Sequence, residues 1–168
     1  MRAAGERPAS SAFDHSVLIN APPRRVLEAF FDPIALARWW QATRSVTTPR
    51  PLGVYAIEWE PTPELDEVLG RLGGVFHGQV IEYQPGREFF VADAWWLPPD
   101  GDPLGPMSLQ VNCVIDGPAS RLRVRQSGGE GGPRWERYYA VIGSGWMTSM
   151  AALKQYVEAG RPAARPHK

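Results

Sequence analysis

The sequence predicts an α+β fold that combines an antiparallel sheet of about seven strands with two short helices and one long C-terminal helix. Three observations predict it. The chain opens with a strand pattern and two short helix patterns. Hydrophobicity then alternates with a period of two as far as residue 127, and the segment at 134–159 repeats at steps of three and four.

The opening strand is expected at 13–20, where apolar residues alternate weakly with polar ones. Pro22-Pro23 favours the start of a helix, because proline is preorganised for a first helical turn. Asp32-Pro33 ends that helix and begins a second short one at 34–40, with Asp32 as its N-cap. The chain therefore begins with a strand followed by two helices.

The middle of the chain is expected to form the rest of the sheet. Short Pro, Gly, Asp and Asn turns separate its β-prone runs, so neighbouring strands pair antiparallel. The insertions at 61–73 and 98–106 are expected to be loops at an end of the sheet, the first with a helical turn at 64–71. The expected strands are 43–48, 52–60, 74–83, 87–96, 107–116 and 120–127.

Composition narrows the class of protein. The 168 residues fit one domain, expected at 13–159, with a disordered head at 1–12 and a disordered tail at 160–168. Eighteen basic against 18 acidic residues argue against nucleic-acid binding. No apolar run suits a signal peptide or a membrane span, so a cytoplasmic protein is expected. One cysteine and three scattered histidines give no metal-site spacing, so neither a metal nor a cofactor is expected.

Several segments resemble a known family. Ile19-Asn-Ala-Pro-Pro-Arg-Arg-Val-Leu-Glu-Ala-Phe-Phe-Asp-Pro33 and Leu36-Ala-Arg-Trp-Trp40 are similar to the opening of one branch of the START-like, or SRPBCC, superfamily. This branch is named after the activator of the heat-shock-protein-90 ATPase. Phe76-His-Gly-Gln-Val-Ile-Glu-Tyr-Gln-Pro-Gly-Arg87, Gly145-Trp146 and Leu153-Lys-Gln-Tyr156 resemble the same branch. The resemblance covers residues 13 to 159 and implies a helix-grip fold, whose sheet curves around the long helix.

In such a fold, the space between sheet and helix is either a ligand cavity or a filled core. Mostly apolar walls with a few polar points are typical of a small-molecule pocket, but aromatic rings also fill cores. A shift of one residue in strand pairing would turn the other face of the strand inward. Phe90 and Trp96 are therefore the alternative lining residues of the strand at 88–96. The residues expected to line the space are Trp39, Tyr55, Ile57, Trp59, Phe76, Val80, Phe89, Val91, Asp93, Trp95, Leu109, Val111, Gln126, Tyr139, Ile142, Trp146 and Met150.

Three functions follow from this reading. The leading hypothesis is the binding of a small hydrophobic or aromatic molecule without catalysis. The enzymatic alternative is a polyketide cyclase or aromatase-like activity, with Asp93 as a weak candidate acid or base if it is desolvated, or a solvated strand residue if it faces outward. The resemblance also implies a co-chaperone-like regulator of the heat-shock-protein-90 ATPase.

Three further features carry open interpretations. Trp95-Trp96-Leu-Pro-Pro99 is interpreted either as a lid over the cavity or as a contact in a homodimer. One face of a strand carries Arg121, Arg123 and Arg125. These arginines are interpreted either as a docking patch for an acidic partner or as a solvated face that nearby acidic residues neutralise. Cys113 lies in an apolar strand and is interpreted as an inert core residue.

Overall fold

The computed structural model describes residues 12–160. The predicted head and tail lie almost entirely outside the described residues, although Ala12 already belongs to the first strand. The elements, in chain order, are β1 (Ala12–Ile19), α1 (Pro23–Glu28), α2 (Pro33–Trp39), β2 (Arg44–Thr47), β3 (Val54–Trp59), β4 (Leu65–Asp66), β5 (Gly70–Arg71), β6 (Gly74–Gln84), β7 (Glu88–Leu97), β8 (Leu104–Asp116), β9 (Ala119–Gly128) and α3 (Pro133–Ala159).

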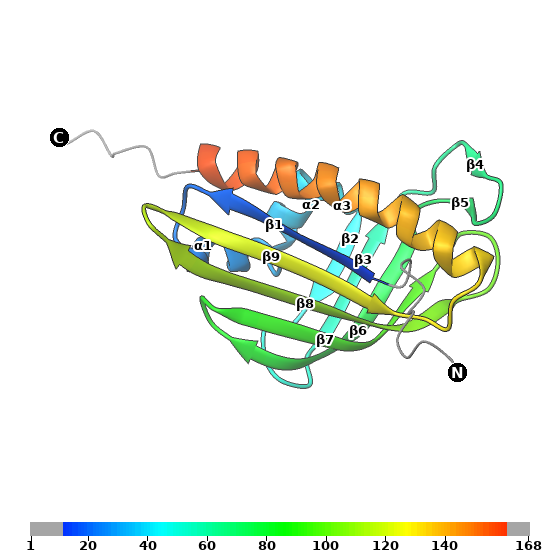
Figure 1. The fold of residues 1–168 in the computed structure, drawn as a ribbon, viewed down its shortest axis with the longest axis horizontal. Coiled ribbons are helices and arrows are strands. Elements are labelled where there is room, and N and C mark those ends of the chain that lie inside the picture. The colour runs from blue at the N-terminus through cyan, green and yellow to red at the C-terminus, as the bar shows by residue number, and fades with distance from the viewer. Residues whose placement is uncertain (1–11, 161–168) are drawn as a thin grey trace, which may run out of the picture.

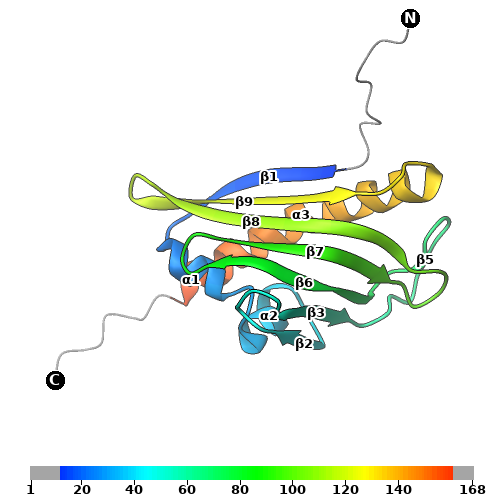
Figure 2. The ribbon, with the colours of Figure 1, turned by 90° about the horizontal axis from the view of Figure 1, so that it is seen from below.

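A seven-stranded antiparallel sheet and the long helix α3 form the two layers of the molecule (Figure 1). The strand order is β1-β9-β8-β7-β6-β3-β2, and Figure 2 shows α3 behind the sheet. β1 and β2 occupy opposite edges, so α1 and α2 carry the chain from one edge to the other at one end of the sheet. This confirms the predicted α+β helix-grip architecture.

The two short helices begin where the sequence predicts. Pro23 starts α1, and the Asp32 carboxylate accepts a hydrogen bond from the N–H of Ile34 at 3.0 Å, which caps α2. Two buried aromatic side chains donate hydrogen bonds to backbone carbonyl groups of the segment that joins α1 to α2. Trp39 Nε1 donates to the carbonyl of Ala29 at 2.9 Å, and the Tyr55 hydroxyl donates to that of Phe30 at 3.1 Å. These bonds fix the helix pair against the sheet.

Aromatic rings fill the space between the sheet and α1 and α2. The Phe30 ring lies edge-on to Trp39 at 5.0 Å and to Phe89 at 5.4 Å, and Tyr55 packs beside Phe89. All four side chains are almost completely buried. At this end of the sheet the expected space is therefore a filled core.

Two local predictions are wrong. Residues 64–71 do not form a helical turn but the small hairpin β4–β5, because the Asp66 carboxylate accepts the N–H groups of Val68 and Leu69 and Gly70 takes a left-handed φ of 78°. The second error concerns β7, where Asp93 has a φ of 50° and the pairing with β8 shifts between Val91 and Ala94.

This bulge changes the facing of the residues that follow it. Trp96 is buried, whereas Asp93 is exposed and Trp95 is only partly buried. The Asp93 carboxylate accepts a hydrogen bond from Trp95 Nε1 at 3.2 Å, so the two side chains lie together on the outer side. Asp93 thus follows the outward, solvated alternative, and its place among the expected lining residues is wrong. The inward facing expected for Trp95 is also wrong, and Trp96 points inward in its place.

Candidate functional site

A cavity of about 390 Å³ lies at the end of the sheet that is remote from α1. The ends of α2, β3 and β7 surround it together with the start of β6, the β4–β5 hairpin and one stripe of α3. Its lining residues are Trp40, Gln41, Trp59, Glu60, Thr62, Leu69, Leu72, Gly73, Phe76, Trp96, Tyr138, Val141, Ile142, Gly145, Trp146 and Ser149.

Six aromatic side chains belong to the wall, and the protein itself uses most of their polar atoms. Trp59 Nε1 donates to the carbonyl of Trp40 at 2.8 Å, and Trp96 Nε1 donates to that of Gly73 at 2.7 Å. The rings of Trp40 and Trp59 stand at 73° with centroids 5.2 Å apart, and Trp40 also packs on Trp146 at 4.8 Å. Rings held in this way offer rigid apolar surface to a guest.

A buried polar network lies at the base of the cavity. Trp146 Nε1 donates to Gln126 Oε1 at 2.8 Å, while Gln126 Nε2 donates to the Tyr138 hydroxyl oxygen at 2.9 Å and approaches Met107 Sδ at 3.4 Å. Burial raises the pKa of Tyr138 well above its ordinary value, so this hydroxyl stays protonated at neutral pH. The network fixes the two aromatic rings that α3 contributes to the base.

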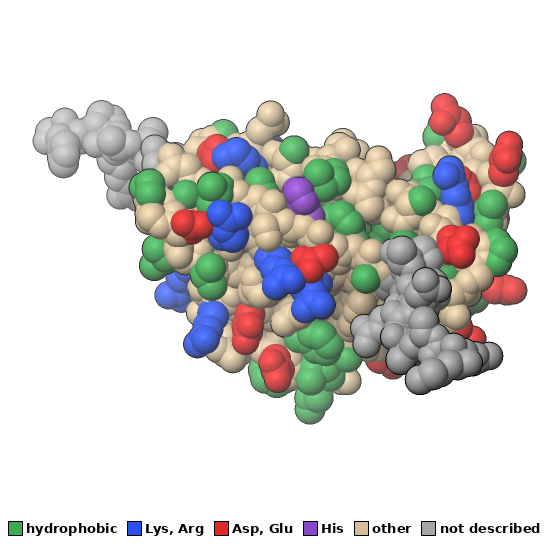
Figure 3. Space-filling model, in the orientation of Figure 1, with side chains coloured by type: hydrophobic (Ala, Val, Ile, Leu, Met, Phe, Trp, Pro, Cys, Tyr) green, Lys and Arg blue, Asp and Glu red, His purple; other side chains and the backbone are tan. Residues whose placement is uncertain are grey.

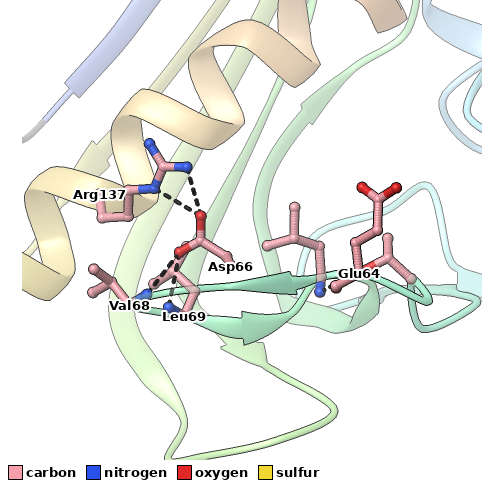
Figure 4. Close-up of polar contacts among 7 residues, drawn as sticks. Glu64, Asp66, Val68, Leu69 and Arg137 are labelled. Carbon is pink, nitrogen blue, oxygen red and sulfur yellow. Dashed lines mark hydrogen bonds and ion pairs between the residues drawn. The ribbon is translucent and has the colours of Figure 1, made fainter.

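The β4–β5 hairpin covers the cavity from the side of α3, because Leu69 and the neighbouring Leu72 belong to its lining. Arg137 reaches from α3 to Asp66 with N···O distances of 2.8 and 2.6 Å (Figure 4). Arg71, at the base of the hairpin, binds Asp100 at 2.9 Å. Side-chain contact with Arg137 and the N–H groups of the hairpin lower the pKa of Asp66 to about 2. The hairpin is thus fastened to the body of the protein by two ion pairs.

The structure divides the predicted site residues into three groups. Trp59, Phe76, Ile142 and Trp146 line the cavity. Asp93 and Trp95 lie on the outer side. The remaining residues are buried beside the cavity or in the filled core, namely Trp39, Tyr55, Ile57, Val80, Phe89, Val91, Leu109, Val111, Gln126, Tyr139 and Met150.

The two other polar points that the sequence suggested are bonded within the protein. Gln126 belongs to the buried network, and the Tyr139 hydroxyl donates to the carbonyl of Gly128 at 2.9 Å. Sequence reasoning missed Tyr138, although Tyr138, Ile142, Gly145 and Ser149 follow one another at steps of four, three and four on α3. It also missed the hairpin residues, for which the sequence carries no periodic signal.

The three strand arginines form ion pairs with acidic neighbours. Arg121 binds Asp116 at 2.9 Å, and Arg123 and Arg125 bind Asp14 at 2.6 and 3.5 Å. Figure 3 shows such basic and acidic side chains intermixed over β1 and β9. The arrangement agrees with a solvated, neutralised face.

Comparison with known proteins gives a family and a fold. The sequence model of the family described as activator of Hsp90 ATPase homolog 1-like protein matches residues 20–158. No curated protein matches the chain. Across residues 12–160, no helix combines the length and the apolar character needed to cross a membrane.

Solved structures share the fold at low sequence identity. A protein from Mesorhizobium loti has a TM-score of 0.69 at 18% identity, with 89% of this chain and 98% of that chain covered. The Aha1 dimer from Colwellia psychrerythraea gives 0.64 at 14%, with 89% and 98% covered. DynU16, from the dynemicin biosynthetic locus, gives 0.58 at 22%, and the match covers 90% of this chain but only 49% of that one. At these identities the likeness concerns the fold.

Proposed function

Because the chain belongs to the family of activator of Hsp90 ATPase homolog 1-like proteins, we propose that it uses its family fold to bind a small apolar or aromatic molecule. The binding site is the cavity between α3, the β4–β5 hairpin and the end of the sheet. The observation that carries the proposal is an open space of about 390 Å³ with six aromatic side chains in its wall.

The size and chemistry of this space support the proposal. Ligand pockets typically measure about 300–1,000 Å³ and combine apolar walls with a few polar groups. The filled aromatic core supports the lining residue Trp40, whose ring stacks on Trp39 and lies edge-on to Phe30, so a guest meets preformed surface. No chemical step is part of this proposal, and Asp93, the residue expected to serve a cyclase-like reaction, is on the outer side.

The test is a titration with neutral two-ring and three-ring aromatic compounds. Binding is expected to quench tryptophan fluorescence, because Trp40, Trp59, Trp96 and Trp146 all line the cavity, and to raise the melting temperature. Ile142→Ala enlarges the cavity and is expected to change the affinity. Ile34→Ala is the matched control, since Ile34 is 69% exposed on α2. The absence of binding across the panel, or equal effects of the two variants, would contradict the proposal.

We also propose that the chain forms a homodimer, as the Aha1 protein from Colwellia psychrerythraea does. Sedimentation velocity at several protein concentrations is the direct measurement. A mass near 37 kDa, twice the chain's 18.6 kDa, is expected at high concentration, and a monomer throughout would contradict this part of the proposal.

A further inference from the structure

Three contacts determine how the Gln126 amide is oriented at the base of the cavity. An indole N–H only donates, so the Gln126 atom that lies 2.8 Å from Trp146 Nε1 is the oxygen. The amide nitrogen therefore faces the Tyr138 hydroxyl oxygen at 2.9 Å and Met107 Sδ at 3.4 Å. Gln126 is 3% exposed, and both of its amide hydrogens and its oxygen are occupied.

This orientation leaves the Tyr138 hydroxyl with an unused proton. The hydroxyl oxygen accepts a hydrogen from Gln126, so its own hydrogen must be donated elsewhere. Among the residues the structure describes, none accepts it. Tyr138 is 4% exposed and belongs to the lining of the cavity, so its hydroxyl is a buried donor beside the space that a guest would fill.

Neighbouring aromatic donors differ in this respect. Tyr139, Trp59 and Trp96 each donate to a backbone carbonyl. Among the described residues, the Trp40 indole N–H also has no acceptor, but its ring is only partly buried. Tyr138 is therefore the well-buried lining donor that a guest is able to satisfy.

The charge of the lining limits the kind of acceptor. Glu60, which is exposed at the end of β3, is the one charged side chain in the lining, which contains no Lys, Arg or His. A carboxylate guest would lose its hydration without meeting a cation, which is unfavourable. A carbonyl oxygen accepts a hydrogen bond and carries no net charge.

We propose that the guest is an uncharged aromatic compound with a carbonyl oxygen, and that the Tyr138 hydroxyl donates the hydrogen bond that orients it. This inference rests on the proposed binding function and adds the class of ligand. Tyr138 is then a specificity-determining residue, because it distinguishes a carbonyl from an apolar group of the same shape.

The experiment compares two probes of equal skeleton, 2-acetylnaphthalene and 2-isopropenylnaphthalene, in which C=CH₂ replaces C=O. Calorimetric titration gives the ratio of their affinities for wild type, for Tyr138→Phe and for the matched control Tyr139→Phe. We expect this ratio to fall about twofold to tenfold in Tyr138→Phe, the range of one net hydrogen bond. The ratio is expected to stay at the wild-type value in Tyr139→Phe, because the Tyr139 hydroxyl of the wild type already donates to the carbonyl of Gly128.

The ratio of the two affinities separates recognition of the carbonyl group from a general loss of stability. Tyr138→Phe also leaves Gln126 Nε2 without its acceptor, but any loosening of the cavity affects both probes together. The infrared carbonyl stretch of the bound ketone gives a second readout, which is expected to shift to lower frequency in wild type and not in Tyr138→Phe. 2-Naphthoate tests the charge argument, and its affinity is expected to be at least about tenfold weaker than that of the ketone.

Several results would overturn the inference. An unchanged ratio in Tyr138→Phe, an unshifted carbonyl stretch in the wild-type complex, or naphthoate binding as tight as the ketone would each do so. The infrared result on wild type holds even if Tyr138→Phe does not fold. If other aromatic compounds bind and the ketone does not, this inference fails while the proposed function stands. If no compound of the panel binds, the proposed function fails as well.

Discussion

Replacing Gly145 with leucine is expected to weaken ligand binding while making the fold more stable. Gly145 lies on the stripe of α3 that includes Tyr138, Ile142 and Ser149 and lines the cavity. A Cβ atom placed at Gly145 would meet nothing within 4 Å. A larger side chain therefore extends into open space without a clash at its first atom.

The two effects have opposite signs and known scales. A leucine side chain adds four carbon groups, roughly 120 Å³ if each takes up about the volume of a water molecule. The cavity of about 390 Å³ then falls below about 300 Å³, the lower end of the range for ligand pockets. The affinity for a guest that fills the wild-type cavity is expected to drop at least about tenfold. Leucine is favoured over glycine inside a helix by about 0.8 kcal/mol, which corresponds to a rise of roughly 2–3 °C in melting temperature.

Calorimetric titration with a bound aromatic probe and thermal unfolding without it measure the two effects separately. Gly143→Ala is the control, because it improves the same helix at a position outside the cavity, where the new Cβ would lie 3.6 Å from Phe13 Cδ2. It is expected to raise the melting temperature and to leave the affinity unchanged. Wild-type affinity in Gly145→Leu would refute the placement of the site, and a loss of more than about 1 kcal/mol of stability would refute the open space beside Gly145.

Three further predictions concern the hairpin, the cysteine and the arginine face. Asp66→Asn is expected to speed hydrogen exchange of the amides at 65–71 and the exchange of bound ligand, because it weakens the contact with Arg137. The pKa of Asp66 is about 2 against an ordinary 3.8, so the wild-type carboxylate holds the hairpin above pH 3.8 and releases it as the pH falls through about 2. Equal exchange rates in wild type and variant at pH 6 would count against the role of this ion pair in holding the hairpin. Burial raises the pKa of Cys113 to about 11, so modification by a thiol reagent at pH 8 is expected to follow global unfolding in denaturant, and a rate equal to that of a free thiol would be inconsistent with a core cysteine. Asp14→Asn is expected to cost less than about 1 kcal/mol in urea unfolding, since the Asp14–Arg123 pair is more than 40% exposed on both sides, and a larger cost would show that this face is more than a solvated surface.

The order of the elements was predictable because it depends on strong, local signals. Pro22-Pro23 and Asp32-Pro33 mark the ends of helices wherever they occur, and the apolar stripe of α3 is long enough to exclude a strand. The inward face of β3 was also predictable, because Tyr55, Ile57 and Trp59 alternate without interruption. Such features need no knowledge of distant residues.

The cavity was harder to predict because single residues interrupt the pattern around it. One left-handed residue, Asp93, reverses the facing of Trp95 and Trp96, and no alternation rule shows where a bulge will occur. The position of the hairpin beside the cavity depends on a contact between Asp66 and Arg137, 71 positions apart. Whether aromatic rings fill a space or border it depends on such contacts, so the filled end and the open end of the same sheet look alike in sequence.

The indole N–H signals of the seven tryptophans, followed by ¹⁵N-resolved NMR during titration with 2-acetylnaphthalene, show whether this cavity binds the ligand. We expect shifts for Trp40, Trp59, Trp96 and Trp146, which line the cavity, and none for Trp95, which lies on the outer side. Shifts confined to Trp95, or no shift in the four cavity signals while the ketone binds, would contradict the claim that this cavity is the binding site.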